Sequence, residues 1–509
     1  MEIAASLREE AREMGRQADA LQASVVAPVS QGGTWMKSMK LLAAALVTGG
    51  SLLYSQSFAQ GQPLTPPQKE LRAIYQELVE INTTNSVGSC TKAASSMAAR
   101  LKAGGYADAD MQIVIPPGAP RKGNLVARLK GDGSKKPLLL LAHVDVVEAR
   151  REDWERDPFK LIEENGMFYA RGSADDKAMA AVFVANMIRY KRERLPLKRD
   201  IILALTCDEE MGAQSEFNGV DFLLKNHRNL IDAEIALNEG GGGLLDKAGN
   251  PQRHGIQAGE KIFQSFQLEV TNPGGHSSIP PRENAIYRLT EGLSRLGKFD
   301  FPFRLSDVTR SYYERMSKIE TGQVAADMKA ILREPPDAAA LERLYTISPA
   351  NNAAVRTTCV ATMLDAGHAD NALPQRARGV VNCRILPGEK VEDVQQTMAR
   401  VMADDKIKIT PMGKVVIAPA PPLTPELMKP VEDISAEMWP GVPVIPAMSA
   451  GATDGRFLNN VGIWTYGISG MFGGPSPSGA HGLNEHLRVK SLYESQEFLY
   501  RLGKRLGGG

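Results

Sequence analysis

The sequence predicts an α/β fold with a mostly parallel sheet, interrupted by an inserted α+β domain of the ferredoxin-like type. Three observations support this. The apolar runs 138–147 and 200–206 are typical of strands that are buried on both faces of a sheet. Helix-forming segments such as 177–191 separate these runs, and alternating strands and helices indicate a parallel sheet. From Lys261 onward the pattern changes to one that matches β-α-β-β-α-β.

The first domain is expected to consist of two separate parts of the chain, residues 60–260 and 413–509. Apolar residues recur at helical spacing from Leu71 to Ile81, and a second helix is expected near 93–101. Further elements are expected in this order: strands 111–115 and 123–129, then, after the buried runs, helix 217–228 and strand 233–238. The α/β pattern resumes at about Val415, so the second domain interrupts the first.

The inserted domain is expected to span residues 261–412. Residues 303–352 are polar and rich in helix-forming residues, and they are interpreted as an insertion within this domain. The remaining elements are strand 263–270, helix 282–296, strands 355–363 and 377–385, helix 391–403 and strand 407–411. Without the insertion, these elements follow the ferredoxin-like order.

Composition limits the classes of partner. The chain of 509 residues is long enough for two or three domains, and 43% hydrophobic with 23% charged residues is typical of a soluble globular protein. A formal net charge of +1 gives no reason to expect nucleic acid or an anionic membrane as a partner. Composition therefore favours neither of these two classes of partner.

The N-terminal region has the pattern of a signal peptide. Lys37 and Lys40 precede an apolar stretch that continues to about Phe58, and cleavage is expected after Ala59. Because a signal peptide should begin the chain, we expect translation to start at Met36 or Met39. Residues 36–59 would then be the signal peptide, and residues 1–35 a misassigned extension. This pattern predicts a periplasmic or secreted protein.

Export would permit disulfide bonds among the four cysteines. Cys359 and Cys383 lie in two strand-like runs joined by a turn-rich segment, so they could face each other across neighbouring strands. Two buried free thiols fit the sequence equally well. A metal site made of thiolates is not expected, because the chain has no Cys-x-x-Cys motif.

Five short motifs place acidic and histidine residues at the ends of apolar runs. In chain order they supply a histidine, an aspartate, a pair of glutamates, a further glutamate and a second histidine. Nitrogen and oxygen ligands of these types suit a site for two metal ions. The motifs are Ala142-His143-Val144-Asp145, Ala174-Asp175-Asp176-Lys177, Asp208-Glu209-Glu210, Asn238-Glu239-Gly240 and Ala480-His481-Gly482.

The spacing within two motifs indicates a division of roles. His143 and Asp145 are separated by one residue on an expected strand, so both side chains would point to the same face. Asp145 could then accept a hydrogen bond from one ring nitrogen while the other binds a metal. Glu209 and Glu210 are adjacent and cannot point the same way, so one would bind a metal and the other would face the substrate water. The glycines after Glu239 do not form a phosphate-binding loop, because no helix start with Lys-Ser/Thr follows.

The ordered set resembles the M20 family of zinc metallopeptidases and amidohydrolases, which includes carboxypeptidases, aminoacylases and deacylases. The resemblance implies two Zn²⁺ ions, with Co²⁺ or Mn²⁺ as possible substitutes. His143 and Glu239 would hold one ion and Glu210 and His481 the other, with Asp175 as the bridge. This chain has Ala178 where the family usually has glycine, which removes no ligand.

By the same resemblance, Glu209 is the general base for a water that bridges the two ions, and Asp145 assists at the catalytic centre. The segment Asn272-Pro-Gly-Gly-His-Ser-Ser resembles the family's lid motif. It implies that His276 donates to the developing oxyanion, in many members from the other subunit of a dimer. The remaining histidines match no motif and are expected to be solvated or capping: His227, His254, His368 and His486.

Four further residues are candidates for substrate binding. Asn371 and Arg384 lie in segments that resemble the substrate-facing side of the lid, and Thr453 and Arg456 lie in a segment like the family's Gly-Gly-Thr-x-Asp-x-Arg element. A guanidinium can bind a carboxylate through two hydrogen bonds, so both arginines are candidates for the substrate's C-terminal carboxylate. The alternative for Arg456 is an ion pair with Asp454.

The resemblance implies an enzyme that releases a C-terminal amino acid by cleaving an amide bond, either a carboxypeptidase or an N-acyl-amino-acid hydrolase. The segment from His143 to Trp154 and the long insertion resemble the carboxypeptidase S-like branch. A dipeptidase is a close alternative. An inactive metal-bound binding protein and a phosphohydrolase are alternatives of other classes, and the second lacks an evident phosphate cradle. A homodimer through the lid domain is also implied, although the insertion could either block or enlarge that interface.

Overall fold

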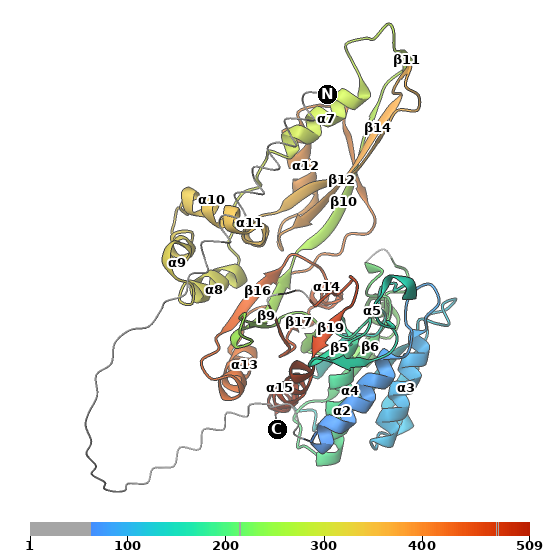
Figure 1. The fold of residues 1–509 in the computed structure, drawn as a ribbon, viewed down its shortest axis with the longest axis vertical. Coiled ribbons are helices and arrows are strands. Elements are labelled where there is room, and N and C mark those ends of the chain that lie inside the picture. The colour runs from blue at the N-terminus through green and yellow to red at the C-terminus, as the bar shows by residue number, and fades with distance from the viewer. Residues whose placement is uncertain (1–62, 213–214, 475, 477, 509) are drawn as a thin grey trace, which may run out of the picture. The chain divides into compact units, whose positions relative to one another are not determined.

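The computed structural model of the chain describes residues 63–212, 215–474, 476 and 478–508. The expected signal peptide and the residues before it lie outside this range. Among the described residues, no helix combines the length and the apolar character that a membrane crossing requires. The predicted α/β fold class is confirmed, because a large sheet with a parallel centre is accompanied by a separate antiparallel sheet in the inserted segment (Figure 1).

The large sheet is mixed, with neighbouring strands in the order β1-β2-β6-β3-β7-β17-β9-β8-β18 and with β16 paired to β9. The central pairs β6–β3, β3–β7 and β7–β17 are parallel. The strands are β1 (Met111–Val114), β2 (Asn124–Leu129), β3 (Leu138–His143), β6 (Ile201–Thr206), β7 (Ile235–Asn238), β8 (Gly242–Leu245), β9 (Pro251–Glu260), β16 (Val444–Ser449), β17 (Trp464–Gly467) and β18 (Phe472–Gly473).

Helices cover both faces of this sheet. The central strands β3 and β6 are therefore buried along their whole length. Leu138 and Leu140 pack in one apolar cluster with α2, α3, α4, α13 and α15, whereas Leu139 and Leu141 pack on the other face with α5, α6 and α14. The helices are α2 (Pro66–Val79), α3 (Cys90–Ala103), α4 (Lys177–Glu193), α5 (Gly219–Asn226), α6 (Arg228–Ile231), α13 (Pro425–Met438), α14 (Gly455–Asn460) and α15 (Val489–Gly507), with short 3-10 helices at Asp108–Asp110 and Arg151–Asp153.

The inserted segment forms a four-stranded antiparallel sheet in the order β12-β14-β10-β15. Helices α7 and α12 pack on one face of it in a single apolar cluster (Figure 1). In chain order these elements are β10, α7, β12, β14, α12 and β15, which is the ferredoxin-like arrangement. Their bounds are β10 (Ile262–Thr271), α7 (Ala285–Leu296), β12 (Thr358–Ala366), β14 (Arg376–Ile385), α12 (Val391–Met402) and β15 (Lys408–Met412), and a short hairpin pairs β11 (Gly275–His276) with β13 (Ala372–Leu373).

Four further helices lie between α7 and β12 in the chain, in the region interpreted as an insertion: α8 (Asp307–Met316), α9 (Gly322–Ala330), α10 (Ala338–Ile347) and α11 (Pro349–Val355). They form their own apolar cluster, which also includes Ile445 of β16. Arg315 donates to Glu432 Oε1 and to the carbonyl oxygen of Val444, both at 2.8 Å. The insertion therefore packs against a strand of the large sheet.

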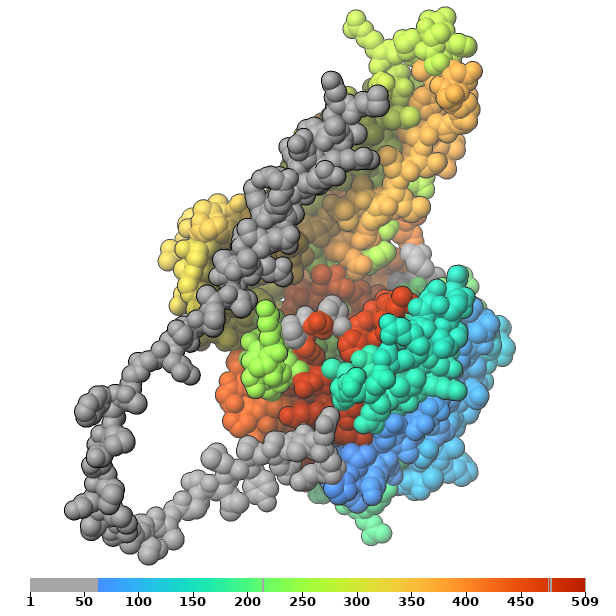
Figure 2. All heavy atoms as spheres, viewed as in Figure 1, coloured from blue at the N-terminus to red at the C-terminus, as the bar shows by residue number. Residues whose placement is uncertain are grey.

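Two sequence-based expectations about elements were wrong, and one small sheet was missed. The strand expected at 138–147 ends at His143, because Asp145 turns its carboxylate toward the backbone N–H groups of Glu209 and Glu210. The helix expected at 217–228 is divided into α5 and α6 at His227. The small sheet of β4 (Ile162–Glu164), β5 (Met167–Tyr169) and β19 (His486–Arg488) was not predicted, and Figure 2 shows its C-terminal segment in red beside the earlier strands in teal.

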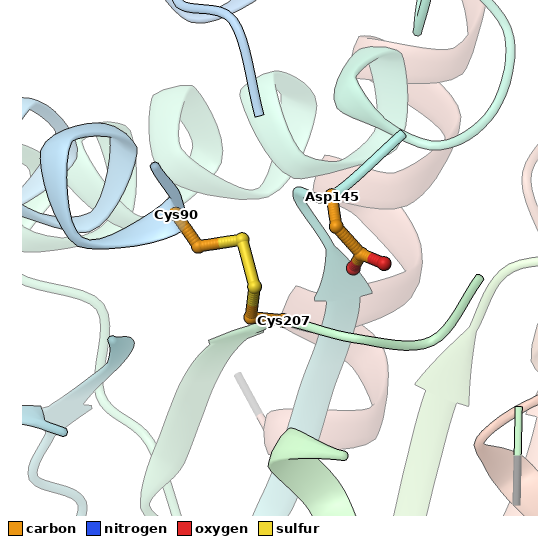
Figure 3. A group of neighbouring side chains, drawn as sticks. All are labelled: Cys90, Asp145 and Cys207. Atoms are coloured by element: carbon orange, nitrogen blue, oxygen red, sulfur yellow. A yellow bond between two sulfur atoms is a disulfide. The ribbon is translucent and has the colours of Figure 1, made fainter. Parts of the chain in front are cut away.

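The cysteines form two disulfide bonds. Cys359 and Cys383 are joined across β12 and β14, which is one of the two states that the sequence left open. The bond between Cys90 and Cys207 was not predicted, because 117 residues separate the two positions. It joins the first residue of α3 to the residue that follows β6, next to Asp145 (Figure 3).

Candidate metal centre

The predicted metal ligands gather where the parallel strands of the large sheet end. His143 is the last residue of β3, and Glu239 directly follows β7. Glu210 follows β6, and Asp175 lies just before α4. In open α/β sheets, the carboxyl ends of the strands are where ligands bind. His481 reaches the same place from the loop before β19.

Asp175 lies between the two histidines. Its Oδ1 is 3.1 Å from His143 Nε2 and its Oδ2 is 3.2 Å from His481 Nε2. Each histidine also has one glutamate beside it: Glu239 Oε1 is 3.8 Å from His143 Nε2, and Glu210 Oε2 is 2.9 Å from His481 Nε2. Asp175 is thus shared by two pairs, His143 with Glu239 and His481 with Glu210.

This arrangement suits divalent cations. Donor atoms of His143, Asp175 and Glu210 lie within 4.8 Å of one another, and so do those of His143, Glu209 and Glu239. Burial raises the pKa of Glu210 to about 7. Burial and the neighbouring Glu239 hold the pKa of Glu209 well above its usual value. Crowded carboxylates of this kind need positive charge nearby, and the nitrogen and oxygen donors fit zinc and related ions.

A third group, Cys90, Asp145 and Cys207, also has its donor atoms within 4.8 Å. It does not suit a metal, because both sulfur atoms are bonded to each other and neither is a thiolate (Figure 3). The value of this group is structural. It holds the end of β6 and the start of the acidic turn against α3.

Asp145 orders two of the metal-binding segments. Its carboxylate accepts hydrogen bonds from the backbone N–H groups of Glu209, at 3.2 Å, and of Glu210, at 3.1 Å. Oδ1 also lies 3.6 Å from His143 Nδ1. The same Nδ1 is 3.1 Å from the backbone carbonyl oxygen of Asp145, and because a carbonyl only accepts, the proton belongs on Nδ1. His143 Nε2 is then free to bind a metal.

Glu485 is a residue whose role the sequence did not indicate. Its buried carboxylate accepts from the backbone N–H groups of Ala174, at 2.8 Å, and Asp175, at 3.0 Å. It also accepts from Arg171 Nη1 at 2.8 Å, and Arg171 Nη2 donates to the carbonyl oxygen of Gly482 at 2.8 Å. This pair therefore ties the loop of Asp175 to the loop of His481. Glu485 lies four residues after His481, and this nearby acidic residue was the only signal for it in the sequence.

A second unpredicted contact fixes the acidic turn. Asp208 has a positive φ of 72°, which is uncommon for a residue other than glycine. Its carboxylate forms a salt bridge with Lys122, whose side chain is mostly buried, and its backbone oxygen accepts from Asn218 Nδ2 at 3.3 Å. Asn218 Nδ2 also donates to Asp454 Oδ1 at 2.6 Å. The turn that carries Glu209 and Glu210 is thus held by Lys122 and by Asn218, which is itself fixed by Asp454.

Three of the four candidate substrate-binding residues lie near one another. Arg456 Nε and Nη2 are buried and have no hydrogen-bond partner in the described part of the chain. Burial, and then the charge of Arg456, lower the pKa of Arg384, so the two guanidinium groups are close enough to repel each other. Thr453 is engaged within the protein, because its N–H donates to Glu260 Oε2 at 2.7 Å and its hydroxyl accepts from Asn238 Nδ2 at 3.2 Å.

His276 and Asn371 are held together in the lid. His276 pairs with Ala372 in the β11–β13 hairpin, and the N–H of Ser277 donates to the carbonyl oxygen of Asn371 at 3.1 Å. The ring of His276 is exposed, and its Nδ1 lies 2.7 Å from Ser278 Oγ. These partners of His276 all belong to the lid. The structure therefore brings the two residues together with each other, and not with the metal ligands.

His254 was expected to be solvated or capping, and that expectation was wrong. The ring is fully buried in β9, with Nδ1 2.8 Å from Ser435 Oγ. It lies among the aromatic rings of Trp439, Phe472 and Phe498. Burial lowers the pKa of His254 to about 4, so the ring is neutral. Its role is packing, and the strand β9 that carries it was not recognised in the sequence.

Comparison with protein-family models finds a match to peptidase family M20/M25/M40 over residues 139–505. The human N-fatty-acyl-amino acid synthase/hydrolase PM20D1 is 30% identical over 383 residues, which cover 73% of this chain and 74% of that protein. A probable carboxypeptidase S-like protein 2 of Dictyostelium discoideum is 28% identical over 394 residues, which cover 75% and 74% of the two chains.

Solved structures show the same fold. An M20 family metallo-carboxypeptidase from Sulfolobus solfataricus superposes with a TM-score of 0.63 at 20% identity, covering 87% of this chain and all of that one. A dinuclear metal-binding peptidase of the same family from Bacillus subtilis has a TM-score of 0.55 at 13% identity, covering 87% and 98%. The family match spans His143 through His481, so it includes every candidate metal ligand.

Proposed function

Because the chain belongs to peptidase family M20/M25/M40, we propose that it is an exported hydrolase that uses two divalent metal ions, preferably zinc, to release a C-terminal amino acid. Family membership makes it a metallopeptidase or metallo-amidohydrolase. The proposed reaction is cleavage of the amide bond in a peptide or in an N-acyl amino acid. The named activities of the relatives, a fatty-acyl-amino acid hydrolase and a carboxypeptidase S-like protein, support this pair of substrates.

One observation supports the proposal most strongly. Asp175 lies between His143 and His481, and each histidine has its own glutamate. His143 and Glu239 would hold one ion and His481 and Glu210 the other, with Asp175 shared between them. When bound, the ions would supply a Lewis acid that polarises the scissile carbonyl and makes water more acidic.

Glu209 is the proposed general base. It follows a buried strand, and its backbone is fixed by Asp145 beside the candidate ligands. Its carboxylate would take a proton from the attacking water and then give that proton to the leaving nitrogen. Asp145 acts by holding Glu209, Glu210 and His143 in place, so it is a positioning residue rather than a proton donor.

Arg456 and Arg384 are the proposed site for the substrate's C-terminal carboxylate. Among the described residues, Nε and Nη2 of Arg456 are buried without a hydrogen-bond partner, which is costly, and a carboxylate would satisfy them with charge-assisted hydrogen bonds. The alternative for Arg456, interaction with Asp454, also has support, because the charge of Arg456 opposes the burial that raises the pKa of Asp454. Asp454 Oδ1 itself accepts from Asn218. Thr453 would contribute by holding the loop that carries Arg456.

His276 is proposed to act from the lid of a second copy of the chain. His276 bonds within its own lid, and β12 is an outer strand of the lid sheet. Val360, Met363 and Leu364 on β12 are each more than half exposed, and an exposed apolar edge strand can pair with another strand. Such a dimer would let the lid hairpin with His276 and Asn371 reach the partner's metal centre.

Export is supported by the signal-peptide pattern and by the two disulfides, which are typical of oxidising compartments. Intact-mass analysis of the exported protein tests this part, and a mature N-terminus directly after Ala59 is the expected result. A protein that retains residues upstream of Met36 would contradict it.

The activity is tested with a matched panel of substrates: N-acyl amino acids, peptides with free or amidated C-termini, and dipeptides. Zinc, cobalt and manganese are loaded separately. We expect turnover that requires a free C-terminal carboxylate, and equal cleavage of the amidated peptides would contradict the role of the arginines. Turnover only of dipeptides with a free amine would favour the dipeptidase alternative.

A further inference from the structure

Glu260 is a buried carboxylate to which the proposed reaction gives no role. It is the last residue of β9, directly before the chain crosses into the lid, and only 3% of it is exposed. Its Oε2 accepts from the N–H of Thr453 at 2.7 Å. Its Oε1 is buried and has no hydrogen-bond partner in the part of the chain that the structure describes. Such a carboxylate is costly to bury unless positive charge lies close to it.

The positive charge comes from the loop that Glu260 holds. An added Cβ at Gly455 would lie 3.6 Å from Glu260 Oε1, so the carboxylate lies against the backbone between Thr453 and Arg456. Burial raises the pKa of Glu260 to about 7, and the N–H of Thr453 and the charge of Arg456 act against this rise. Arg456 is itself buried, and its Nε and Nη2 have no hydrogen-bond partner among the described residues. Two buried groups of opposite charge therefore lie close together.

Two other carboxylates act on this pair. Asp454 Oδ1 accepts from Asn218 Nδ2 at 2.6 Å, and its charge also acts on Arg456. The charge of Glu239 acts on Glu260, but in the proposed reaction Glu239 binds a metal ion, which offsets that charge. Glu260 differs from Asp454 because it belongs to β9 and not to the loop itself. It can therefore both hold the loop in place and compensate the charge that the loop carries.

The space around Glu260 is too small for a substrate group. Glu260 lines a cavity of about 10 Å³ together with Glu239 and Thr453. A cavity of this size holds one water molecule at most. Because a substrate carboxylate cannot enter it, any effect of Glu260 on the substrate must pass through the loop of Thr453 and through Arg456.

We propose that Glu260 is a positioning residue for the carboxylate site and that it sets how tightly this site binds. The inference rests on the proposed function, in which Arg456 and Arg384 take the substrate's C-terminal carboxylate. Through Thr453, Glu260 holds the loop that carries Arg456. Through its charge, it balances Arg456 while the site is empty and opposes the carboxylate that arrives. The released amino acid carries the same carboxylate, so Glu260 also helps this product to leave.

The test measures by calorimetry how tightly the zinc-loaded enzyme binds free L-amino acids and the matching amino acid amides. The probes are alanine, leucine, phenylalanine, lysine and glutamate, at a pH of about 8.5, where Glu260 is ionised. Glu260→Gln keeps an oxygen for the N–H of Thr453 and removes the charge. It should bind the acids about 10-fold more tightly than wild type and leave binding of the amides unchanged. Glu260→Ala also loses the oxygen, so it should bind the acids about 5-fold more weakly than Glu260→Gln does.

Arg456→Gln and the double variant complete a mutant cycle. If Glu260 acts through Arg456, then Glu260→Gln should change the binding of the acids by less than about 2-fold once Arg456 has been replaced. Glu291→Gln is the control, because Glu291 is an exposed residue of α7, and it should bind every probe as wild type does. Metal content and thermal melting show that each variant is folded and loaded.

The proposal is overturned if Glu260→Gln binds the acids no more tightly than wild type, or if its effect persists without Arg456. Equal gains for the acids and the amides, or equal losses in both Glu260 variants, would show that Glu260 supports only the fold. A wild type that binds acids and amides alike would refute the carboxylate site together with this proposal. The proposed function fails in a different way, because wild type would then hydrolyse no member of the substrate panel, whatever the binding constants are.

Discussion

The metal-binding segments and the lid hairpin differ in how their functional side chains are held. Asp145 and Glu485 are buried carboxylates, and each accepts backbone N–H groups from the loops that carry the candidate ligands. In the lid, His276 is exposed and bonds to Ser278 two residues away. The first region is complete within its own domain. The second presents its side chains outward, as expected for groups that act on another surface.

Replacing the proposed base should have the largest effect on turnover. Glu209→Gln keeps the size of the side chain and removes its ability to accept a proton, so kcat should fall by about 10²–10⁴-fold. Metal content should stay at two ions for each chain, because Glu210 and Glu239 remain. Steady-state kinetics and metal analysis check both results. Glu216→Gln, on an exposed neighbour, is the control. Activity close to wild type in Glu209→Gln would place the base elsewhere.

His276→Ala should lower kcat by about 10²-fold, as for the loss of one oxyanion donor. The sharper experiment mixes this variant with Glu209→Gln after dissociation and reassociation. If His276 acts on the partner, the mixed dimer contains one site with an intact Glu209 and an intact incoming His276, so activity returns. If the mixture stays as inactive as its components, His276 does not act across subunits.

Glu485→Gln should weaken metal binding by about 10–100-fold, because outer groups that orient metal ligands have effects of this size. The loops of Asp175 and His481 would lose their common anchor. Competition with a chelator measures affinity, and thermal melting of the metal-free protein reports any general loss of stability. Glu163→Gln, on the exposed strand β4, is the control. A variant that melts earlier but binds metal normally would show that Glu485 supports only the fold.

His254 should give the smallest effect, on stability alone. Its pKa is about 4 in the folded protein and about 6.5 in an unfolded chain. As pH falls below 6.5, the unfolded state takes up a proton that the folded state takes up only near pH 4, so stability falls across this window. At pH 5 the buried neutral ring of His254 lowers the free energy of unfolding by about 2 kcal/mol.

Urea unfolding at pH 7.5 and pH 5 checks this expectation. His254→Phe should show a smaller loss of stability between the two pH values than wild type, by about that amount. His368→Phe changes an exposed histidine and should keep the wild-type difference. If the two variants lose equal stability between pH 7.5 and pH 5, burial of His254 does not cause the pH dependence of stability.

The candidate ligands could be predicted because each stands next to an element with a clear pattern. His143 and Glu239 end buried strands, and the carboxyl ends of parallel strands meet at one edge. Asp175 lies in an acidic motif just before α4, and Glu210 lies in an acidic motif shortly after β6. The order of the ferredoxin-like elements could also be predicted, because helices and strands have different periods of apolar residues.

The supporting contacts could not be predicted, because they join positions far apart in the chain. Arg171 and Glu485 meet across 314 positions, and Cys90 and Cys207 across 117. His254 lies in β9, which alternates buried and half-buried positions but places a histidine, glycines and a glutamate where a clear strand signal would have apolar residues. Its burial depends on aromatic rings from α13, β18 and α15 that no local pattern places beside it.

The insertion of helices α8–α11 has a mechanical consequence. The insertion interrupts the lid in sequence, but Arg315 in α8 bonds to Glu432 and to the backbone of Val444 in the domain of the large sheet. Lys261, at the first crossing between the domains, donates to the carbonyl oxygens of Ala353 and Arg356 in the insertion. A lid joined only by its two chain crossings could swing freely about them. Here the insertion forms a third attachment, so rotating the lid about its two crossings would require breaking the contacts of Arg315 with Glu432 and Val444.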